Sequence, residues 1–102
     1  MIGLRPSYVR ITANYSLTEY NHTIECSNNN EITLYLPSSP RLGQCYTIIQ
    51  RGGKVVLSSG SKINILNIRE GSLSGTWYSD TKGQVSWFWY NGGQWIVTYS
   101  TR

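Results

Sequence analysis

Residues 84–99 have the sequence QVSWFWYNGGQWIVTY, in which two runs of β-branched and aromatic residues flank Asn91-Gly92-Gly93. The Asn-Gly pair accommodates the positive φ angles that a tight hairpin turn requires, so this stretch predicts two antiparallel strands. Side chains alternate across a strand, which places Val85, Trp87 and Trp89 on one face and Ser86, Phe88 and Tyr90 on the other. A half-solvated sheet needs only one apolar face. This strand therefore either lies centrally between two layers or turns its second face to another subunit or a ligand.

The rest of the chain repeats the pattern of short extended runs between turn residues, and no window shows the periodicity of an amphipathic helix. We expect further strands at residues 8–12, 22–26, 32–36, 44–50, 54–57, 63–65 and 76–78. Pro37 ends the clearest of them, because proline cannot donate to a strand ladder. Gly52-Gly53 predicts a tight hairpin connection. Together these runs predict an all-β fold, a compact antiparallel β-sandwich or barrel-like domain.

The composition fits one folded domain. A chain of 102 residues is long enough for a single core, so we expect one β domain over residues 1–102 with its module at about 8–99. Only 14% of the residues are charged, which argues against disorder. No apolar run approaches the roughly 18 residues of a membrane-spanning helix, so we expect no membrane insertion. The unusual feature is 4 Trp and 8 Tyr against 1 Phe, a mixture typical of strands and of binding surfaces.

Charge and metal-binding residues exclude several classes of function. The net charge of +4 comes from nine basic and five acidic side chains without a basic run. Nucleic-acid binding is therefore not the expected function, and single-stranded nucleic acid is kept only as an alternative partner. Cys26, Cys45 and His22 cannot supply the four ligands of a structural zinc site, so we expect no metal and no cofactor. The cysteines are expected to be reduced thiols, with a Cys26–Cys45 bridge as the alternative.

No arrangement of residues indicates catalysis. Glycoside hydrolysis needs two carboxyl groups at a fixed separation, whereas Glu25 and Glu31 flank an asparagine-rich turn and are typical of a solvated edge. His22 and Cys26 share a strand face but lie about 13 Å apart along an extended chain, too far for a direct hydrogen bond. We therefore expect a protein that is not an enzyme.

Four segments in a fixed order carry a resemblance to a known family. They are YNHTIEC at 20–26, EITLYLP at 31–37, GQCYTII at 43–49 and GGKVVL at 52–57, followed by a closing hairpin with Gly83, Val85, Trp87, Gly92, Trp95 and Val97. This order resembles a β-module found near the C-termini of tailed-phage tail fibre, tailspike and neck appendage proteins, and the resemblance covers about residues 8 to 99. The chain departs from the family pattern at residues 58–61, where a glycine-aspartate turn is often found.

The resemblance implies a virion component that is made in the host cytoplasm and lies near the tip of a fibre or appendage. Such modules are usually homotrimers that cap and register the chains of a parent fibre or appendage protein, and some contact a glycan or protein on the host surface. The family has no shared catalytic residues, so none is transferred to this chain. A closed three-fold assembly would also cover strand edges and a large apolar patch.

Aromatic residues and their polar neighbours near the C-terminus are the candidates for receptor, glycan or subunit contacts. They are Trp77, Tyr78, Asp80, Phe88, Trp89, Tyr90, Asn91 and Gln94. Aromatic rings stack on the apolar faces of sugar rings, and amide or carboxyl groups bond sugar hydroxyls. For Trp87 and Trp95 we expect burial in the core or in a subunit contact instead. A carbohydrate-binding module is therefore the alternative to a trimerising virion module.

Overall fold

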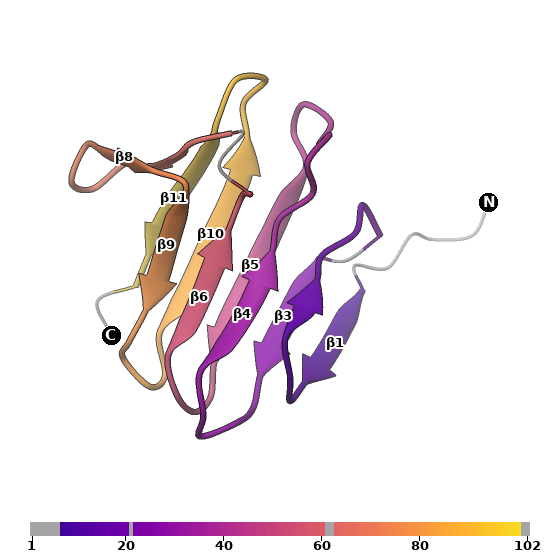
Figure 1. The fold of residues 1–102 in the computed structure, drawn as a ribbon, viewed down its shortest axis with the longest axis vertical. Helices are drawn as coiled ribbons and strands as arrows, with labels where there is room; N and C mark the ends of the chain where they lie inside the picture. Colours follow the sequence, from indigo (N-terminus) through magenta and orange to yellow (C-terminus); the bar gives the residue numbers. More distant parts are fainter. Residues whose placement is uncertain (1–6, 21, 61–62, 101–102) are drawn as a thin grey trace.

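The computed structural model describes residues 7–20, 22–60 and 63–100, which form an all-β fold of two facing sheets without helices (Figure 1). The strands are β1 (Tyr8–Ile11), β2 (Tyr15–Ser16), β3 (Thr23–Cys26), β4 (Ile32–Tyr35), β5 (Cys45–Gln50), β6 (Val55–Ser58), β7 (Ile65–Asn67), β8 (Ser72–Ser74), β9 (Thr76–Ser79), β10 (Val85–Tyr90) and β11 (Trp95–Tyr99). Each strand expected from the sequence has a counterpart, although the one expected at 63–65 is displaced to Ile65–Asn67. Only β2 and β8 were not predicted, because both are very short and β8 is fully exposed.

The chain alternates between the two sheets over its N-terminal half. The larger sheet has the order β1-β3-β5-β10-β11-β7-β8, and the smaller has the order β2-β4-β6-β9. Each passage from β1 to β6 adds a strand parallel to the one before it in the same sheet, so that Ile24 lies opposite Ile48 and Leu34 lies opposite Leu57. The N-terminal half is thus a coil of stacked turns, and the antiparallel strands β9 and β10 close it.

The expected antiparallel arrangement is wrong for this coil. The pairs β1–β3, β3–β5, β2–β4, β4–β6 and β7–β11 are parallel, whereas β5–β10, β10–β11, β6–β9 and β7–β8 are antiparallel. Alternation of apolar residues specifies which face of a strand is buried, but not the direction of its neighbour. The loops after β3 and β5 cross from one sheet to the other, so the strands that they join cannot pair.

Gly52-Gly53, expected to form a hairpin, is one of these crossing loops. It stacks on the preceding turn of the coil, where the Gly53 amide donates to the Asn28 carbonyl at 2.7 Å. A Cβ at Gly52 would lie 2.2 Å from the Asn28 carbonyl oxygen, and one at Gly53 would lie 2.3 Å from that of Asn29. The close approach of two backbones, rather than a hairpin turn, is therefore what requires glycine here.

Gly53→Ala should lower the free energy of unfolding by about 1–3 kcal/mol, since the added methyl group forces the two stacked backbones apart. Urea unfolding followed by circular dichroism measures this loss. Gly93→Ala is the matched control, because a Cβ at Gly93 would meet only the Asn91 side-chain oxygen, at 3.8 Å. Equal stability of the two variants would contradict the stacking.

The core lies between the sheets and takes alternate residues from both. The larger sheet buries Ile24, Ile48, Phe88, Trp95 and Val97, and the smaller sheet buries Ile32, Leu34, Val55 and Leu57. The inward face predicted for residues 32–36 is confirmed, because Leu36 is buried as well. Trp95 is also in the core, where its ring centroid lies 5.7 Å from that of Tyr46.

A buried polar cluster joins the two sheets at one end of the core. The Ser79 hydroxyl, on β9 of the smaller sheet, is hydrogen-bonded to the side chains of Gln50 on β5 and Gln84 just before β10. Gln84 Nε2 in turn donates to the Ser100 carbonyl at 2.9 Å. Because buried amides are costly to leave unpaired, the serine hydroxyl is expected to stabilise this junction.

Ser79→Ala should destabilise the protein by about 1–3 kcal/mol, because both glutamine side chains lose a hydrogen-bond partner inside the core. Thermal and urea unfolding of the variant provide the measurement. Ser16→Ala, at the exposed position of β2, serves as the control and should change stability by less than about 0.5 kcal/mol. A loss as small for Ser79→Ala as for this control would show that the cluster contributes nothing.

Candidate functional site

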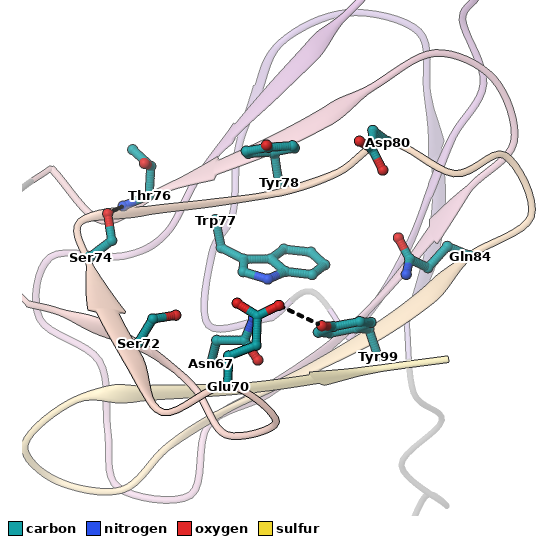
Figure 2. A pocket seen from close by; sticks show the side chains of 10 residues that line it. All are labelled: Asn67, Glu70, Ser72, Ser74, Thr76, Trp77, Tyr78, Asp80, Gln84 and Tyr99. Atoms are coloured by element: carbon teal, nitrogen blue, oxygen red, sulfur yellow. Dashed lines mark hydrogen bonds between the residues drawn. The ribbon is translucent and has the colours of Figure 1, made fainter. Parts of the chain in front are cut away.

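The structure separates the candidate contact residues into four groups. Trp77 and Asp80 line a groove beside β9, where Tyr78 borders the lining but turns its ring away from Trp77 onto the outer face of the smaller sheet (Figure 2). Trp89 lies on the outer face of the larger sheet, Tyr90, Asn91 and Gln94 lie at the β10–β11 turn, and Phe88 lies in the core. A contact role for Phe88 is wrong in this chain, since its inward position on β10 leaves none of the ring exposed. The remaining candidates therefore do not form one surface.

The outer face of the larger sheet carries a continuous line of apolar side chains, here called the apolar row. The strand register places Cys45, Trp89, Ile96, Leu66 and Leu73 side by side on β5, β10, β11, β7 and β8. Trp89 is 42% exposed and Leu73 is 55% exposed. A contiguous exposed apolar surface of this kind is typical of an interaction site, whereas a sheet face that stays in water is usually polar.

Strand β10 extends this face beyond the apolar row with Trp87 and Val85, which are both partly exposed. Trp87 lies between Thr47 and Thr98, and Val85 lies opposite Ile49. The strand is thus central within its sheet and covered by the second sheet on one side only. Burial of Trp87 in the core, one of the two positions expected for it, is wrong because alternation points this ring outward.

The outer face of the smaller sheet is different in character. Its outward residues, taken from the strand register and exposure, are Thr33, Tyr35, Val56, Ser58, Thr76 and Tyr78. Hydroxyl groups dominate this face, and the Lys54 ammonium lies 4.3 Å from the centre of the Tyr78 ring. The outer face of the smaller sheet can therefore be hydrated, whereas the apolar row on the larger sheet is costly to leave in contact with water.

A charged cluster occupies the β1 end of the larger sheet's outer face. The Glu25 carboxylate is buried there and accepts hydrogen bonds from the Tyr8 hydroxyl, from Arg10 Nε at 3.2 Å and from Arg51 Nη1 at 3.1 Å. The Tyr8 hydrogen bond and the two guanidinium groups lower the pKa of Glu25, although burial opposes them. The same hydrogen bond raises the pKa of Tyr8. The ionised carboxylate is therefore favoured in the folded state.

Glu25 should make stability depend on acid pH. Its folded pKa lies below its unfolded value, so it stabilises the fold above the unfolded pKa and loses this contribution as the pH falls through the folded pKa. Glu25→Gln should therefore be less stable than the parent at pH 7 and lose less stability on acidification. Urea unfolding at a series of pH values tests this. Glu31→Gln, at an exposed 4.0 Å ion pair with Lys54, is the control and should follow the parent curve.

A groove of about 420 Å³ lies beside β9 and next to the β7–β8 segment (Figure 2). Its lining residues are Asn67, Glu70, Ser72, Ser74, Thr76, Trp77, Tyr78, Asp80, Gln84 and Tyr99. The Trp77 ring extends into the middle of this lining, with Tyr99 and Glu70 below it in the view of Figure 2. Trp77 meets Phe88 edge-on at 5.6 Å between ring centroids and lies 5.4 Å from Tyr99. The groove therefore combines an anchored aromatic ring with polar walls.

The polar wall opposite β9 was missed by sequence reasoning. Glu70, Ser72 and Ser74 belong to the β7–β8 hairpin, which was not predicted. The turn is made by Gly71, with φ of 73°, whose amide donates to the Asn67 carbonyl at 2.7 Å. Asn67 and Gly71, two turn-forming residues that follow the short alternating run at 63–65, are the signal that could have indicated this hairpin.

The turn between β10 and β11 has a structural explanation. The Asn91 side-chain oxygen accepts from the backbone amides of Gly93 and Gln94, each at 2.9 Å. Tyr90 packs with its ring centroid 5.4 Å from that of Trp95. Asn91 is thus used to hold the turn and Tyr90 to cover the end of the core.

The two cysteines lie on opposite faces of the larger sheet. Cys26 is buried on the inward face, and burial raises the pKa of its thiol to about 12. Cys45 lies in the apolar row, and both thiols are free, so the alternative of a Cys26–Cys45 bridge is wrong. Within residues 7–20, 22–60 and 63–100, no three His, Cys, Asp or Glu side chains gather in a way that could hold a metal ion.

The described part of the chain contains no helix long and apolar enough to cross a membrane. Neither a protein-family model nor a curated protein matches the sequence. The apolar row and the groove are the two surface features of this chain that point to a function.

Proposed function

We propose that this protein is a non-enzymatic structural module that assembles into a homotrimer through the outer face of its larger sheet. The apolar row carries this proposal, because it leaves Trp89 and Leu73 about half exposed in a single chain. Exposed apolar side chains on several neighbouring strands favour association when a matching surface covers them. The row holds no charged residue, so a second copy of the same face meets no like-charge repulsion there.

The ordered motifs between residues 20 and 97 support a more specific setting. They resemble the terminal β-modules of phage tail fibres, tailspikes and neck appendages, and the number of three copies comes from this resemblance. In that setting the module would lie in the virion, at the distal end of a parent fibre or appendage chain, and would hold three chains in register. A host-surface glycan or protein would be its further partner.

Trp89→Ala should weaken self-association far more than folding. Truncating a central tryptophan in an interface costs about 2 kcal/mol or more, which is roughly 30-fold in the dissociation constant. The same change on a half-exposed strand position should lower the stability of the fold by less than about 1 kcal/mol. Sedimentation velocity should show the parent protein at the mass of three 11.6 kDa chains and the variant shifted towards one.

Tyr35→Ala is the matched control, because Tyr35 is 45% exposed on the outer face of the smaller sheet. It should leave the trimer intact. A parent protein that is monomeric at micromolar concentration would overturn the proposal, and a stable dimer would retain the interface while rejecting the three-fold assembly.

Cys45 offers an independent reporter of the same surface. It lies opposite Trp89 in the strand register. Cys26, in contrast, is buried, and burial raises the pKa of its thiol to about 12. Labelling by a thiol reagent should therefore report Cys45 alone. Its rate should fall as the concentration of the parent protein rises and should stay constant for Trp89→Ala. A rate independent of concentration in the assembled protein would place the interface elsewhere.

Carbohydrate binding is the second candidate function, and the groove beside Trp77 favours it. Strand β8 serves both surfaces, since Leu73 belongs to the apolar row while Ser72 and Ser74 line the groove. Because Leu73 and the two serines lie on opposite faces of β8, the apolar row and the groove are separate surfaces.

A further inference from the structure

We infer that the groove beside Trp77 binds a saccharide that carries no acidic groups. Its volume of about 420 Å³ lies within the range of small-molecule sites, which is roughly 300–1000 Å³. None of its lining residues belongs to the apolar row. The inference therefore does not rest on the homotrimer.

The aromatic part of the groove is held in place before any ligand arrives. Trp77 contacts Phe88 from the core and Tyr99 from β11, with ring centroids 5.6 Å and 5.4 Å away. A ring fixed by two others loses little conformational freedom when a ligand binds. Figure 2 shows the indole reaching across the lining, where the C–H face of a pyranose ring can stack on it.

The polar part of the groove matches the hydrogen-bonding groups of a sugar. Two serine hydroxyls, the Asn67 side-chain amide and two carboxylates line the groove beside the indole, so that donors and acceptors are both present; these residues are Asn67, Glu70, Ser72, Ser74 and Asp80. Each sugar hydroxyl likewise donates and accepts. A carboxylate can accept charge-assisted bonds from two neighbouring hydroxyls, which favours a polyol over an apolar ligand.

Part of this polar wall is already oriented. The Asn67 side-chain oxygen accepts from the backbone amide of Arg69 at 3.1 Å, and the Tyr99 hydroxyl lies 3.5 Å from a Glu70 carboxylate oxygen. These contacts leave the Asn67 amide NH₂ and much of the Glu70 carboxylate able to bond a ligand.

Charge decides which class of saccharide the groove accepts. Among the described residues that line it, only Glu70 and Asp80 are charged, and both are acidic. The nearby Arg69 guanidinium donates to the Tyr99 carbonyl at 3.1 Å and lies over the Tyr99 ring, and Arg69 is not part of the lining. Sialic acids, uronic acids and phosphate groups therefore meet like charge, although the whole chain has a net charge of +4. The same repulsion disfavours a nucleic-acid strand in this groove.

NMR of ¹⁵N-labelled protein tests the inference directly. The indole N–H signal of Trp77 is identified by its absence from the spectrum of Trp77→Phe. The probes are lactose, maltose, cellobiose and N,N′-diacetylchitobiose, together with sialyllactose and a glucuronic-acid disaccharide. At least one neutral disaccharide should shift the Trp77 signal at millimolar concentration. Where a neutral sugar and its acidic derivative are compared, the acidic one should bind at least about tenfold more weakly.

Charge-neutral variants separate a saccharide site from a merely structural cavity. Glu70→Gln combined with Asp80→Asn keeps the shape of the groove but should reduce the discrimination between neutral and acidic sugars to less than about threefold. Tyr35→Ala, on a different surface, should leave binding unchanged. No shift with any neutral probe, equal binding of acidic probes by the parent protein, or a Trp77 shift with oligothymidylate that weakens with salt would each overturn the inference.

Discussion

The backbone pairing between β5 and β10 is the interaction on which the rest of the molecule depends. Up to β6 the chain is a coil of parallel turns, and such a coil leaves the edge of β5 unpaired. Strand β10 closes that edge in the antiparallel direction and carries β11, β7 and β8 with it. The same strand turns Phe88 into the core and Trp89 away from it. The two faces of β10 therefore contribute to the core and to the apolar row, and the hydrogen bonds between β5 and β10 fix the position of both.

This arrangement explains why the two sheets have unlike outer faces. The smaller sheet can meet water on its hydroxyl-rich outer side, as an ordinary two-layer protein does. The larger sheet extends beyond it and exposes an apolar outer side, while β8 at its far end bends past β9 (Figure 1). Because alternate residues of β8 face opposite ways, a three-residue strand contributes both to the apolar row and to the groove. The surface proposed for assembly and the groove proposed for ligand thus meet at a single edge of the fold.

Prediction from sequence succeeded where local pattern carries the information. Alternation located nearly every strand, and it correctly assigned Ile32, Leu34 and Leu36 to the core. It failed for Phe88, because both faces of that strand are apolar and the pattern does not say which one is covered. It also failed at Gly52-Gly53, since a glycine pair that permits a hairpin equally permits two backbones to stack closely. The groove was half predicted, because its second wall depends on a hairpin whose short strands carry little signal.

The sequence by itself therefore determined the class of structure, the positions of the strands and the concentration of aromatic residues near the C-terminus. These follow from side-chain periodicity and turn chemistry, which act over a few residues. Only the tertiary structure decided that the first strands run parallel, that Trp89 and Leu73 share one exposed row, and that Glu70 faces Trp77 across a groove. Strand direction and neighbour order come from loops that cross between sheets, and these relations join residues that are far apart in the chain.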